Sequence, residues 1–566
     1  MNTFASQKTN PGMPLAAEKY QPYPKVDLKD RTWPDKQIEK APIWCSVDLR
    51  DGNQALIDPM GQDRKERMFR LLLEMGFPEI EIGFPSASQT DFDFARWCIE
   101  QGNVPEYVSL QVLVQCRPEL ITRTFEALDG ANHPIVHFYN STSELQRRVV
   151  FAKDVAGVKR IATDGAKMVM DMASKAGKDY RFEYSPESFT GTELEVALEI
   201  SNAVIEIINP TPDNKMILNL PSTVEMSTPN IYADQIEWMG RNIDRRDSVL
   251  ISLHPHNDRG CGIAATELGL LAGADRVEGT LFGNGERTGN VDIVTLALNM
   301  FTQGVNPELD CSNIEKIKEV YEYCNQLLIP ERHPYVGELV YTAFSGSHQD
   351  AINKGMKAMK TSNKSLWEVP YLPIDPRDVG RSYEAIIRIN SQSGKGGIAY
   401  ILQQDYGLNL PRNMQIEFRD IIQHITDSEG KELPPKRIYD EFINTYVDHK
   451  SARFGFKDYK TTTNPSAKGR VTVSAEITDH GVTHDITGEG TGLVDGFIDA
   501  LSKYIGKKLS VVDYSEHSLQ QGSDAKAICY MEIAYPEGKV FGVSIDENIA
   551  TASLSAIVSA VNRLNI

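Results

Sequence analysis

Two histidines stand two residues apart at the end of an apolar run, within the segment LHPHNDRGCG. The run, residues 249–253, predicts a buried strand, and side chains two residues apart on a strand point to the same face. The rings of His254 and His256 could therefore bind one divalent cation, with Asn257 and Asp258 orienting them. A polar turn with incidental histidines explains this motif about as well, so the rest of the sequence must decide.

Two further motifs supply residues of the same chemical kinds. LRDGNQ contains Arg50 and Asp51, and GNGERTGN ends in Asn290. An aspartate at a strand end is a hard oxygen ligand, and the arginine beside it is a fixed cation for a carboxylate or an oxyanion. Asn290 offers a fourth, neutral ligand. Such a mixed nitrogen and oxygen site suits Mg²⁺, Mn²⁺ or Zn²⁺, and it leaves room for a 2-oxo acid whose ketone a Lewis acid would polarise.

A repeated pattern of apolar run, polar turn and helical stretch must position these residues. The eight runs, which we predict to be strands, are residues 43–48, 79–84, 107–115, 134–140, 181–187, 215–223, 249–256 and 276–283. Helical stretches lie between them, for example at 63–75, 118–128, 192–208 and 261–271. Eight strand-helix units over about 260 residues predict an α/β fold, a (β/α)8 TIM barrel.

The active site of this fold lies at the carboxyl ends of the strands. The sequence places unusual polar residues at those ends. Besides the motifs above they are Gln115, His137, Ser185, Glu187 and Thr223. Any one of them could be an ordinary turn residue, but the whole set falling on one face by accident is much less probable.

The chain divides into four predicted parts. Residues 1–42 contain six prolines and predict an extended N-terminal arm. The barrel follows over residues 43–303, and residues 304–440 predict helical linker subdomains, with helices near 313–328 and 339–359. Within the linker, SGKGG at 393–397 predicts a plain turn, because it lacks the GxxxxGK[ST] pattern of a phosphate-binding loop.

Residues 450–566 predict a C-terminal α+β domain. The predicted strands cover 470–477, 483–487, 508–512, 528–533 and 539–545, and helices follow at 493–505 and 550–564. This order suggests two related strand-strand-helix units. The domain carries no pattern that resembles catalytic machinery, so we expect any ligand of it to be regulatory.

Composition limits the possible partners and the compartment. The 566 residues carry a net charge of -19, which argues against nucleic acid or an anionic membrane as the main partner. The seven cysteines include no CxxC pair, which favours a reducing compartment. The sequence has no run of eighteen apolar residues, and its start has no signal-peptide core. We therefore expect a cytoplasmic protein.

The motifs together resemble a known family. LRDGNQ with Lys65, HPHNDRGCG and GNGERTGN, in this order, are similar to the signatures of the α-isopropylmalate and homocitrate synthases. The resemblance covers nearly the whole chain, since the barrel, the linker and the duplicated C-terminal domain match as well. It implies a metal-dependent condensation of acetyl-CoA with 3-methyl-2-oxobutanoate in leucine biosynthesis, and a leucine-binding regulatory domain at 450–566 that gives feedback inhibition.

The resemblance also implies roles for single residues. The metal ligands would be Asp51, His254, His256 and Asn290, with Mg²⁺ favoured. The residues that bind the ketoacid would be Arg50, His137, Ser185 and Thr223. The acid/base groups would be Glu187 and His348, and Arg50 would also stabilise the developing alkoxide. Because His348 lies beyond the barrel, in the linker, we expect a homodimer in which it enters the partner's site.

Three other functions fit parts of this pattern. Citramalate and homocitrate synthases differ only in the pocket for the ketoacid side chain, which the motifs separate poorly. A carbon-carbon lyase could use the same barrel, but it has no need of an end-product sensor. An inactive amino-acid sensor should have lost some metal or acid/base positions, whereas all are filled here.

Overall fold

The computed structural model describes nine stretches of the chain, which are residues 19–102, 104–343, 346–362, 365–381, 395–429, 433–448, 452–463, 470–519 and 525–564. Residues 1–18 of the predicted arm and residues 393–394 of SGKGG lie outside them. The chain forms two compact units, which are described separately below. The first extends to residue 340 and includes 377–381, and the second comprises 341–376 and 382–566.

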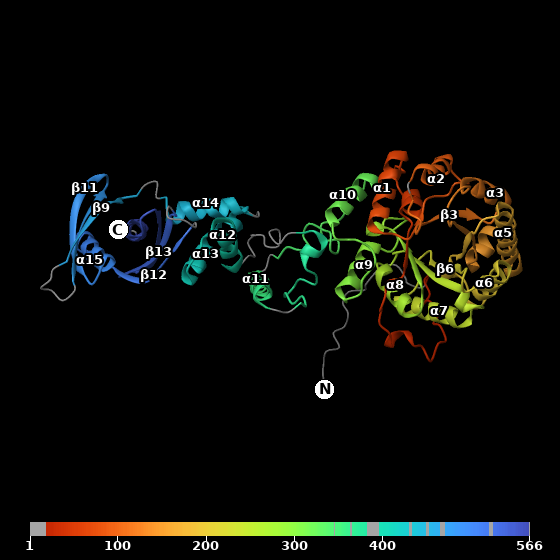
Figure 1. Ribbon diagram of the computed structural model, residues 1–566. Coiled ribbons are helices and arrows are strands. Elements are labelled where there is room, and N and C mark those ends of the chain that lie inside the picture. The colour runs from red at the N-terminus through yellow and green to blue at the C-terminus, as the bar shows by residue number, and fades with distance from the viewer. Residues whose placement is uncertain are drawn as a thin grey trace, which may run out of the picture. The chain divides into compact units, whose positions relative to one another are not determined.

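The first unit is a closed parallel barrel of eight strands (Figure 1). Each strand pairs with the next, and β8 pairs with β1. The strands are β1 Ile43–Ser46, β2 Glu79–Glu81, β3 Ser109–Gln115, β4 Ile135–Ser141, β5 Arg181–Glu187, β6 Met216–Ser222, β7 Val249–Pro255 and β8 Arg276–Gly279. The predicted TIM barrel is confirmed, with every predicted strand present.

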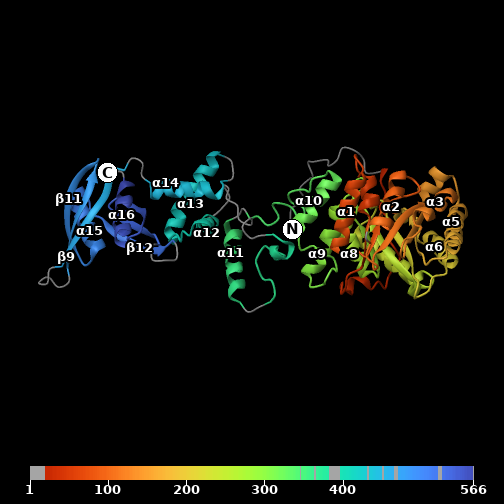
Figure 2. The same ribbon diagram turned by 45° about the horizontal axis from the view of Figure 1, so that its top comes forward.

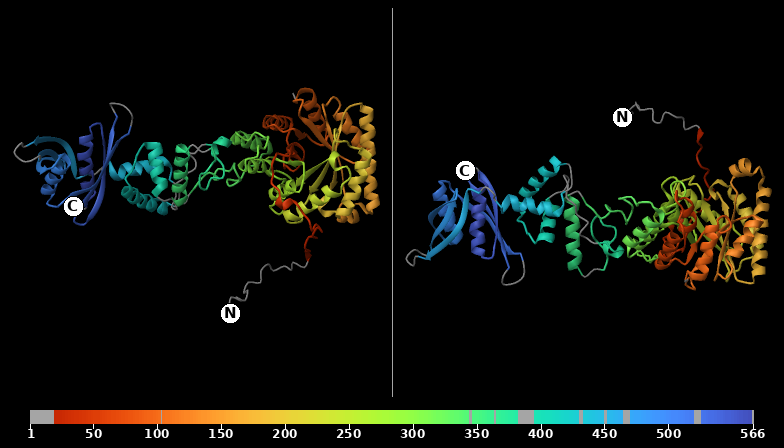
Figure 3. Two further views of the ribbon diagram at one scale, coloured as in Figure 1. Left: turned by 60° about the horizontal axis from the view of Figure 1, so that its bottom comes forward. Right: turned by 90° about the horizontal axis from the view of Figure 1, so that it is seen from above.

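Helices surround the strands, as the left view in Figure 3 shows. They are α1 Gln62–Met75, α2 Gln89–Gln101, α3 Pro118–Ala127, α4 Glu144–Gln146, α5 Val155–Ala176, α6 Leu194–Ile208, α7 Pro229–Asn242, α8 Gly262–Leu271, α9 Ile293–Thr302 and α10 Ile314–Asn325. No described helix is both long and apolar enough to cross a bilayer.

The last barrel strand is shorter than predicted. β8 ends at Gly279, and a short helical turn, Leu281–Gly283, replaces the rest of the predicted strand. A side chain at Gly279 would meet the backbone oxygen of Val291 at 2.6 Å, so the strand end lies tightly against the returning GNGERTGN loop. The loop that carries Asn290 is thereby held against the barrel.

Charged side chains fill part of the barrel interior. Arg276 on β8 is fully buried and donates to Glu79 at 2.5 Å, to Glu278 at 2.7 Å and to Gln111 at 2.8 Å. A buried charge is tolerated only where it is paired and hydrogen-bonded, as it is here. This network fixes the strands beneath the carboxyl-end loops.

The second unit begins with helices. They are α11 Gly346–Thr361, α12 Lys395–Tyr406, α13 Arg412–Glu429 and α14 Pro435–Tyr446. The helix predicted from residue 339 was wrong at its start, because residues 339–341 form a turn and α11 begins at Gly346. Lys395, inside SGKGG, is the first residue of α12, so the second half of this stretch is helical and not a turn.

Two three-stranded antiparallel sheets follow, each with one helix. The elements are β9 Phe454–Thr463, β10 Val471–Asp479, β11 Val482–Gly490, α15 Leu493–Ile505, β12 Ser510–Ser518, β13 Ala527–Tyr535, β14 Gly538–Asp546 and α16 Ile549–Asn562. Figure 2 shows α15 and α16 beside these strands, with which they share one apolar core. The first repeat therefore has three strands where we predicted two, because β9 was missed, and the second repeat has the three strands predicted at 508–512, 528–533 and 539–545.

Close helix-sheet contacts recur in both repeats. A side chain at Gly488 of β11 would meet the backbone of α15 at 2.3 Å, and one at Gly542 of β14 would meet the backbone of α16 at 2.2 Å. Only glycine allows so close an approach. The two sheet-and-helix repeats are thus built alike, which supports the interpretation of an internal duplication.

Candidate metal and active site

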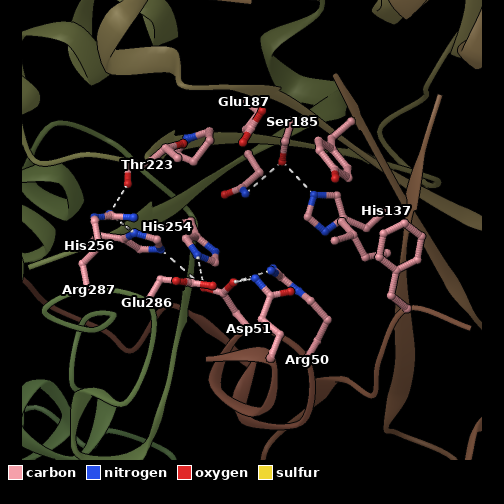
Figure 4. Close-up of a pocket in the computed structure, with 16 residues that line it drawn as sticks. Arg50, Asp51, His137, Ser185, Glu187, Thr223, His254, His256, Glu286 and Arg287 are labelled. Carbon is pink, nitrogen blue, oxygen red and sulfur yellow. Dashed lines mark hydrogen bonds and ion pairs between the residues drawn. The ribbon is translucent and has the colours of Figure 1, made fainter. Parts of the chain in front are cut away.

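A cavity of about 260 Å³ lies among the residues at the carboxyl ends of the barrel strands (Figure 4). Its lining residues are Arg50, Asp51, Gln54, Phe84, Leu113, His137, Tyr139, Ser185, Glu187, Asn219, Pro221, Thr223, His254, His256, Glu286 and Arg287. The site residues predicted in the barrel line this cavity except Asn290 and Gln115, whose Nε2 instead donates to the hydroxyl of Tyr139 at 3.0 Å. The structure therefore brings together predicted side chains from five of the strand ends.

Asp51, His254 and His256 converge at this cavity (Figure 4). Oδ2 of Asp51 lies 3.3 Å from Nε2 of His254 and 3.3 Å from Nε2 of His256. All three side chains are buried, and their potential ligand atoms lie within 4.8 Å of one another. The prediction that the two rings face the same way is confirmed, and the set of donors fits a divalent cation.

A carboxylate inside the barrel orients His254. Nδ1 of His254 lies 2.7 Å from Oε2 of Glu278, which leaves Nε2 directed toward Asp51. Such an outer carboxylate is the usual partner of a metal-binding histidine. Asp258 supports His256 indirectly, as expected, because it binds Arg287, which lies 2.6 Å from Nδ1 of His256. The side chain of Asn257 has a different partner, since its Oδ1 accepts from Gly262 N at the start of α8.

The cluster stabilises positive charge. Burial alone would lower the pKa of His254, but its hydrogen bonds to Asp51 and Glu278 raise the pKa to about 9. Burial would raise the pKa of Asp51, yet Arg50 and the two histidines hold it well below its ordinary value. Asp51 is therefore ionised at neutral pH, as a metal ligand must be.

Asn290 fits the fourth ligand position by its unsatisfied oxygen. Its side chain is buried, and Nδ2 donates to the backbone oxygen of Asn284 at 3.0 Å. Oδ1 has no hydrogen-bond partner among the described residues. Asn290 also forms a backbone bridge with His256, so its side chain starts beside the cluster. A buried amide oxygen without a partner is costly unless something binds it, which a cation would do.

Arg50 and His137 share one buried carboxylate. Arg50 donates to Asp51 at 2.6 Å and forms an ion pair with Glu81. Nδ1 of His137 lies 2.7 Å from Oε2 of Glu81, and Nε2 lies 2.7 Å from Oγ of Ser185. These contacts hold a guanidinium, an imidazole and a hydroxyl group at the wall of the cavity. Together these three groups can bind a small molecule that has a carboxylate and an adjacent polar group.

Glu187 is the remaining barrel residue with a predicted acid/base role. Burial raises the pKa of its carboxyl group, and Arg50 partly offsets this effect. A carboxyl group whose pKa is moved toward neutrality is suited to proton transfer. Thr223 is connected to the residue that follows Glu187. Its Oγ1 accepts a hydrogen bond from Ser188 N at 2.9 Å.

Three family models match successive parts of the chain. They are described as HMGL-like over residues 41–320, as alpha-isopropylmalate synthase, post-catalytic domain-like, over 338–403, and as LeuA allosteric (dimerisation) domain over 432–565. The chain is 77% identical to the 2-isopropylmalate synthase of Brucella suis biovar 1, across 98% of this chain and 100% of that protein. This chain belongs to the 2-isopropylmalate synthase family.

Other members of the 2-isopropylmalate synthase family match over the same extent. The one from Rhizobium meliloti is 77% identical over 98% of this chain and 99% of its own length. The one from Rhodospirillum rubrum is 57% identical over 97% of this chain and 99% of its own length. As a member of the 2-isopropylmalate synthase family the chain is an enzyme, and its C-terminal part matches a domain that is both allosteric and dimerising.

Three residues that contact the arginine and histidine side chains of the site were not predicted. Glu81, Glu183 and Glu278 are fully buried inside the barrel, and each faces a histidine or an arginine of the site. Their signal in the sequence was a charged residue inside an apolar strand, in EIE, RFEY and RVEG. Alternate residues of a barrel strand point inward, so such residues can be found by their spacing.

Two further residues named in the sequence analysis are Lys65, in the first unit, and His348, in the second. Lys65 is buried in an ion pair with Asp91, whose other oxygen accepts from Phe84 N at 2.8 Å, so it stabilises the loop after β2. His348 is exposed on α11 in the second unit, with its ring 4.0 Å from that of Tyr371. Its part in the reaction stays a prediction.

Proposed function

We propose that this enzyme condenses acetyl-CoA with 3-methyl-2-oxobutanoate and hydrolyses the thioester, which gives 2-isopropylmalate and free CoA. The observation that carries the proposal is the cluster of Asp51, His254 and His256 at the wall of the cavity that Arg50 and Glu187 also line. The family to which the chain belongs supports the choice of substrates.

The proposed cation is Mg²⁺, held by Asp51, His254, His256 and Asn290. When bound, it supplies Lewis-acid activation of the ketone. Arg50 lies within hydrogen-bond distance of Asp51, so its guanidinium is placed to stabilise the negative charge that develops on the ketone oxygen. Mn²⁺ or Zn²⁺ would use the same ligands.

His137, Ser185 and Thr223 are the proposed ketoacid contacts. The first two are already hydrogen-bonded to each other, and Asn219 donates to Ser185 at 3.0 Å. Polar groups held by such a network cost little further ordering when a ligand binds. Glu187 and His348 are the proposed acid and base, which move protons at the acetyl methyl group and the ketone oxygen.

A panel of 2-oxo acids tests the substrate. We expect free thiol release from acetyl-CoA to be fastest with 3-methyl-2-oxobutanoate, and slower with pyruvate or 2-oxoglutarate. One methylene group more or less in an apolar pocket changes kcat/KM by about 10- to 200-fold, which such an assay resolves. Preference for pyruvate or 2-oxoglutarate would indicate a citramalate or homocitrate synthase, and no release with any ketoacid would contradict an active enzyme.

We also propose a homodimer in which the partner's His348 completes the site. Large apolar side chains are exposed in the helical segment after β4 and in the loop after β6, namely Leu145 at 58%, Val149 at 63%, Val150 at 67% and Met226 at 47%. Exposed apolar groups beside an active-site opening favour coverage by another surface. The match to a dimerisation domain supports a second copy of this chain as that surface.

Leucine is the proposed inhibitor, and it would bind the domain at 450–566. We expect leucine to inhibit the full chain, and removal of residues 450–566 to abolish inhibition while thiol release continues. The measurement is the initial rate of thiol release against leucine concentration, with alanine as the matched amino acid that should have no effect. Equal inhibition of a folded, active truncated chain would show that leucine binds elsewhere.

A further inference from the structure

Residues 19–42 precede the first barrel strand, and the part from Tyr23 to Trp33 contacts α7 of the barrel in the first unit. Arg31 binds Asp234 with two hydrogen bonds of 2.7 and 2.9 Å, and the backbone nitrogen atoms of Thr32 and Trp33 donate to Glu237 at 2.9 and 3.1 Å. Asp234 and Glu237 are both buried. We call residues 19–42 the N-terminal strap. Hydrogen bonds from residues 31–33 of the strap to two buried carboxylates attach it to the barrel.

The other end of the strap reaches a loop of the active site. The hydroxyl of Tyr23 donates to the backbone oxygen of Thr190 and accepts from Nε2 of Gln235 at 2.8 Å. Gln235 and Thr190 are each 2% exposed, so this hydroxyl sits between two fixed partners. Tyr23 thereby connects α7 to the short helical turn Phe189–Gly191 that follows β5.

The loop after β5 needs such external support. Ser188, directly after Glu187, has a φ of 59°, a left-handed conformation that costs free energy for a residue other than glycine. The loop is held by Ser188 N, which donates to Thr223 Oγ1 at 2.9 Å, and by Thr190 Oγ1, which donates to the Val224 backbone oxygen at 3.0 Å. Tyr23 therefore holds the loop that directly follows Glu187 and is hydrogen-bonded to Thr223.

We infer that Tyr23 is a positioning residue for Glu187 and that the N-terminal strap sets the rate of proton transfer in the barrel site. The inference rests on the proposed acid/base role of Glu187. Thr142 also holds this loop, because its backbone nitrogen donates to the Glu187 backbone oxygen at 3.1 Å. Loss of the Tyr23 hydroxyl should therefore misplace the carboxylate slightly without releasing the loop.

The test compares Tyr23→Phe with Tyr20→Phe in the full chain. Both changes remove one phenolic hydroxyl from the strap, but Tyr20 is 71% exposed. Small misplacement of a catalytic group lowers the rate strongly, so we expect Tyr23→Phe to lower kcat about tenfold. The deuterium isotope effect on kcat with methyl-deuterated acetyl-CoA should rise, because proton removal becomes more rate-limiting. Tyr20→Phe should match the wild type in both.

Metal affinity and stability separate positioning from general damage. The half-saturating Mg²⁺ concentration of Tyr23→Phe should be unchanged, because the proposed ligands are on other loops. A lower melting temperature with an unchanged kcat and isotope effect would overturn the inference and leave Tyr23 a structural residue. Thr190→Val, which removes the hydrogen bond to Val224, should repeat the higher isotope effect, and a wild-type isotope effect in this variant would also count against the inference.

The variant Glu187→Gln separates the proposed acid/base role of Glu187 from the positioning role of Tyr23. If Glu187→Gln keeps near wild-type activity, the proposed role of Glu187 fails, and the inference about Tyr23 fails with it. If Glu187→Gln loses activity while Tyr23→Phe behaves as wild type, only the inference about Tyr23 is overturned.

Discussion

We expect His254→Ala and Asp51→Ala to lower ketoacid-dependent thiol release at least about 10³-fold while the chain remains folded. Lewis-acid activation of a carbonyl contributes several kcal/mol to the transition state, and a factor of ten in rate corresponds to about 1.4 kcal/mol. The two side chains approach each other at 3.3 Å, so removal of either breaks the same cluster. Loss of one ligand should therefore remove nearly all turnover.

The fold should survive the change at His254 because Glu278 keeps other partners. Its carboxylate accepts from Arg276 at 2.7 Å, from Gln111 at 3.0 Å and from Asn219 at 3.2 Å. A buried carboxylate that keeps three donors is not left unpaired, which is the main cause of large losses in stability. Circular dichroism and the melting temperature measure this directly.

His133→Asn is the matched control. His133 is exposed in the turn before β4, so it precedes the amino end of its strand, whereas the site lies at the carboxyl ends. Asparagine tolerates the positive φ of 46° at this position. The control should keep wild-type activity and metal content. Near wild-type thiol release by the native enzyme in the presence of excess chelator would contradict the metal hypothesis.

The barrel could be predicted because its signals are local. Strands such as β6 and β7 are short, mainly apolar runs that end in polar motifs, and period and length define them without reference to the rest of the fold. The positions of Asp51, His254 and His256 agree with the prediction for the same reason, because each follows from a local motif. Residues at strand ends meet once the barrel closes, so their positions along the chain predicted their proximity in space.

The interior carboxylates could not be assigned in this way. Glu278 and Glu81 sit within apolar strands, and their partners lie 24 and 56 residues away in the chain, at His254 and His137. Only the closed barrel brings these pairs together. β9 was missed for a different reason, because its sequence FGFKDYKTTT is mostly polar and its strand character depends on pairing with β10.

A mixture of two inactive variants should recover activity if His348 acts in the partner's site. His348→Ala keeps a complete barrel, and Asp51→Ala keeps a complete His348. In a heterodimer with exchanged subdomains, one of the two sites then combines the intact barrel with the intact histidine. With random exchange at equal amounts, half of the dimers are heterodimers, so about a quarter of wild-type activity should return.

The reciprocal mixture makes the test decisive. Wild-type chains exchanged with an equal amount of the His348→Ala/Asp51→Ala double variant should lose half of their activity, because every heterodimer contains no complete site. If each chain used its own His348, the wild-type chains would keep all of their activity, and the two single variants would recover none. Because His348 is exposed on α11 within its own unit, the change to alanine leaves no buried gap, and subunit exchange can be followed with differently tagged chains. Full activity in the reciprocal mixture despite proven exchange would show that each chain builds its own site.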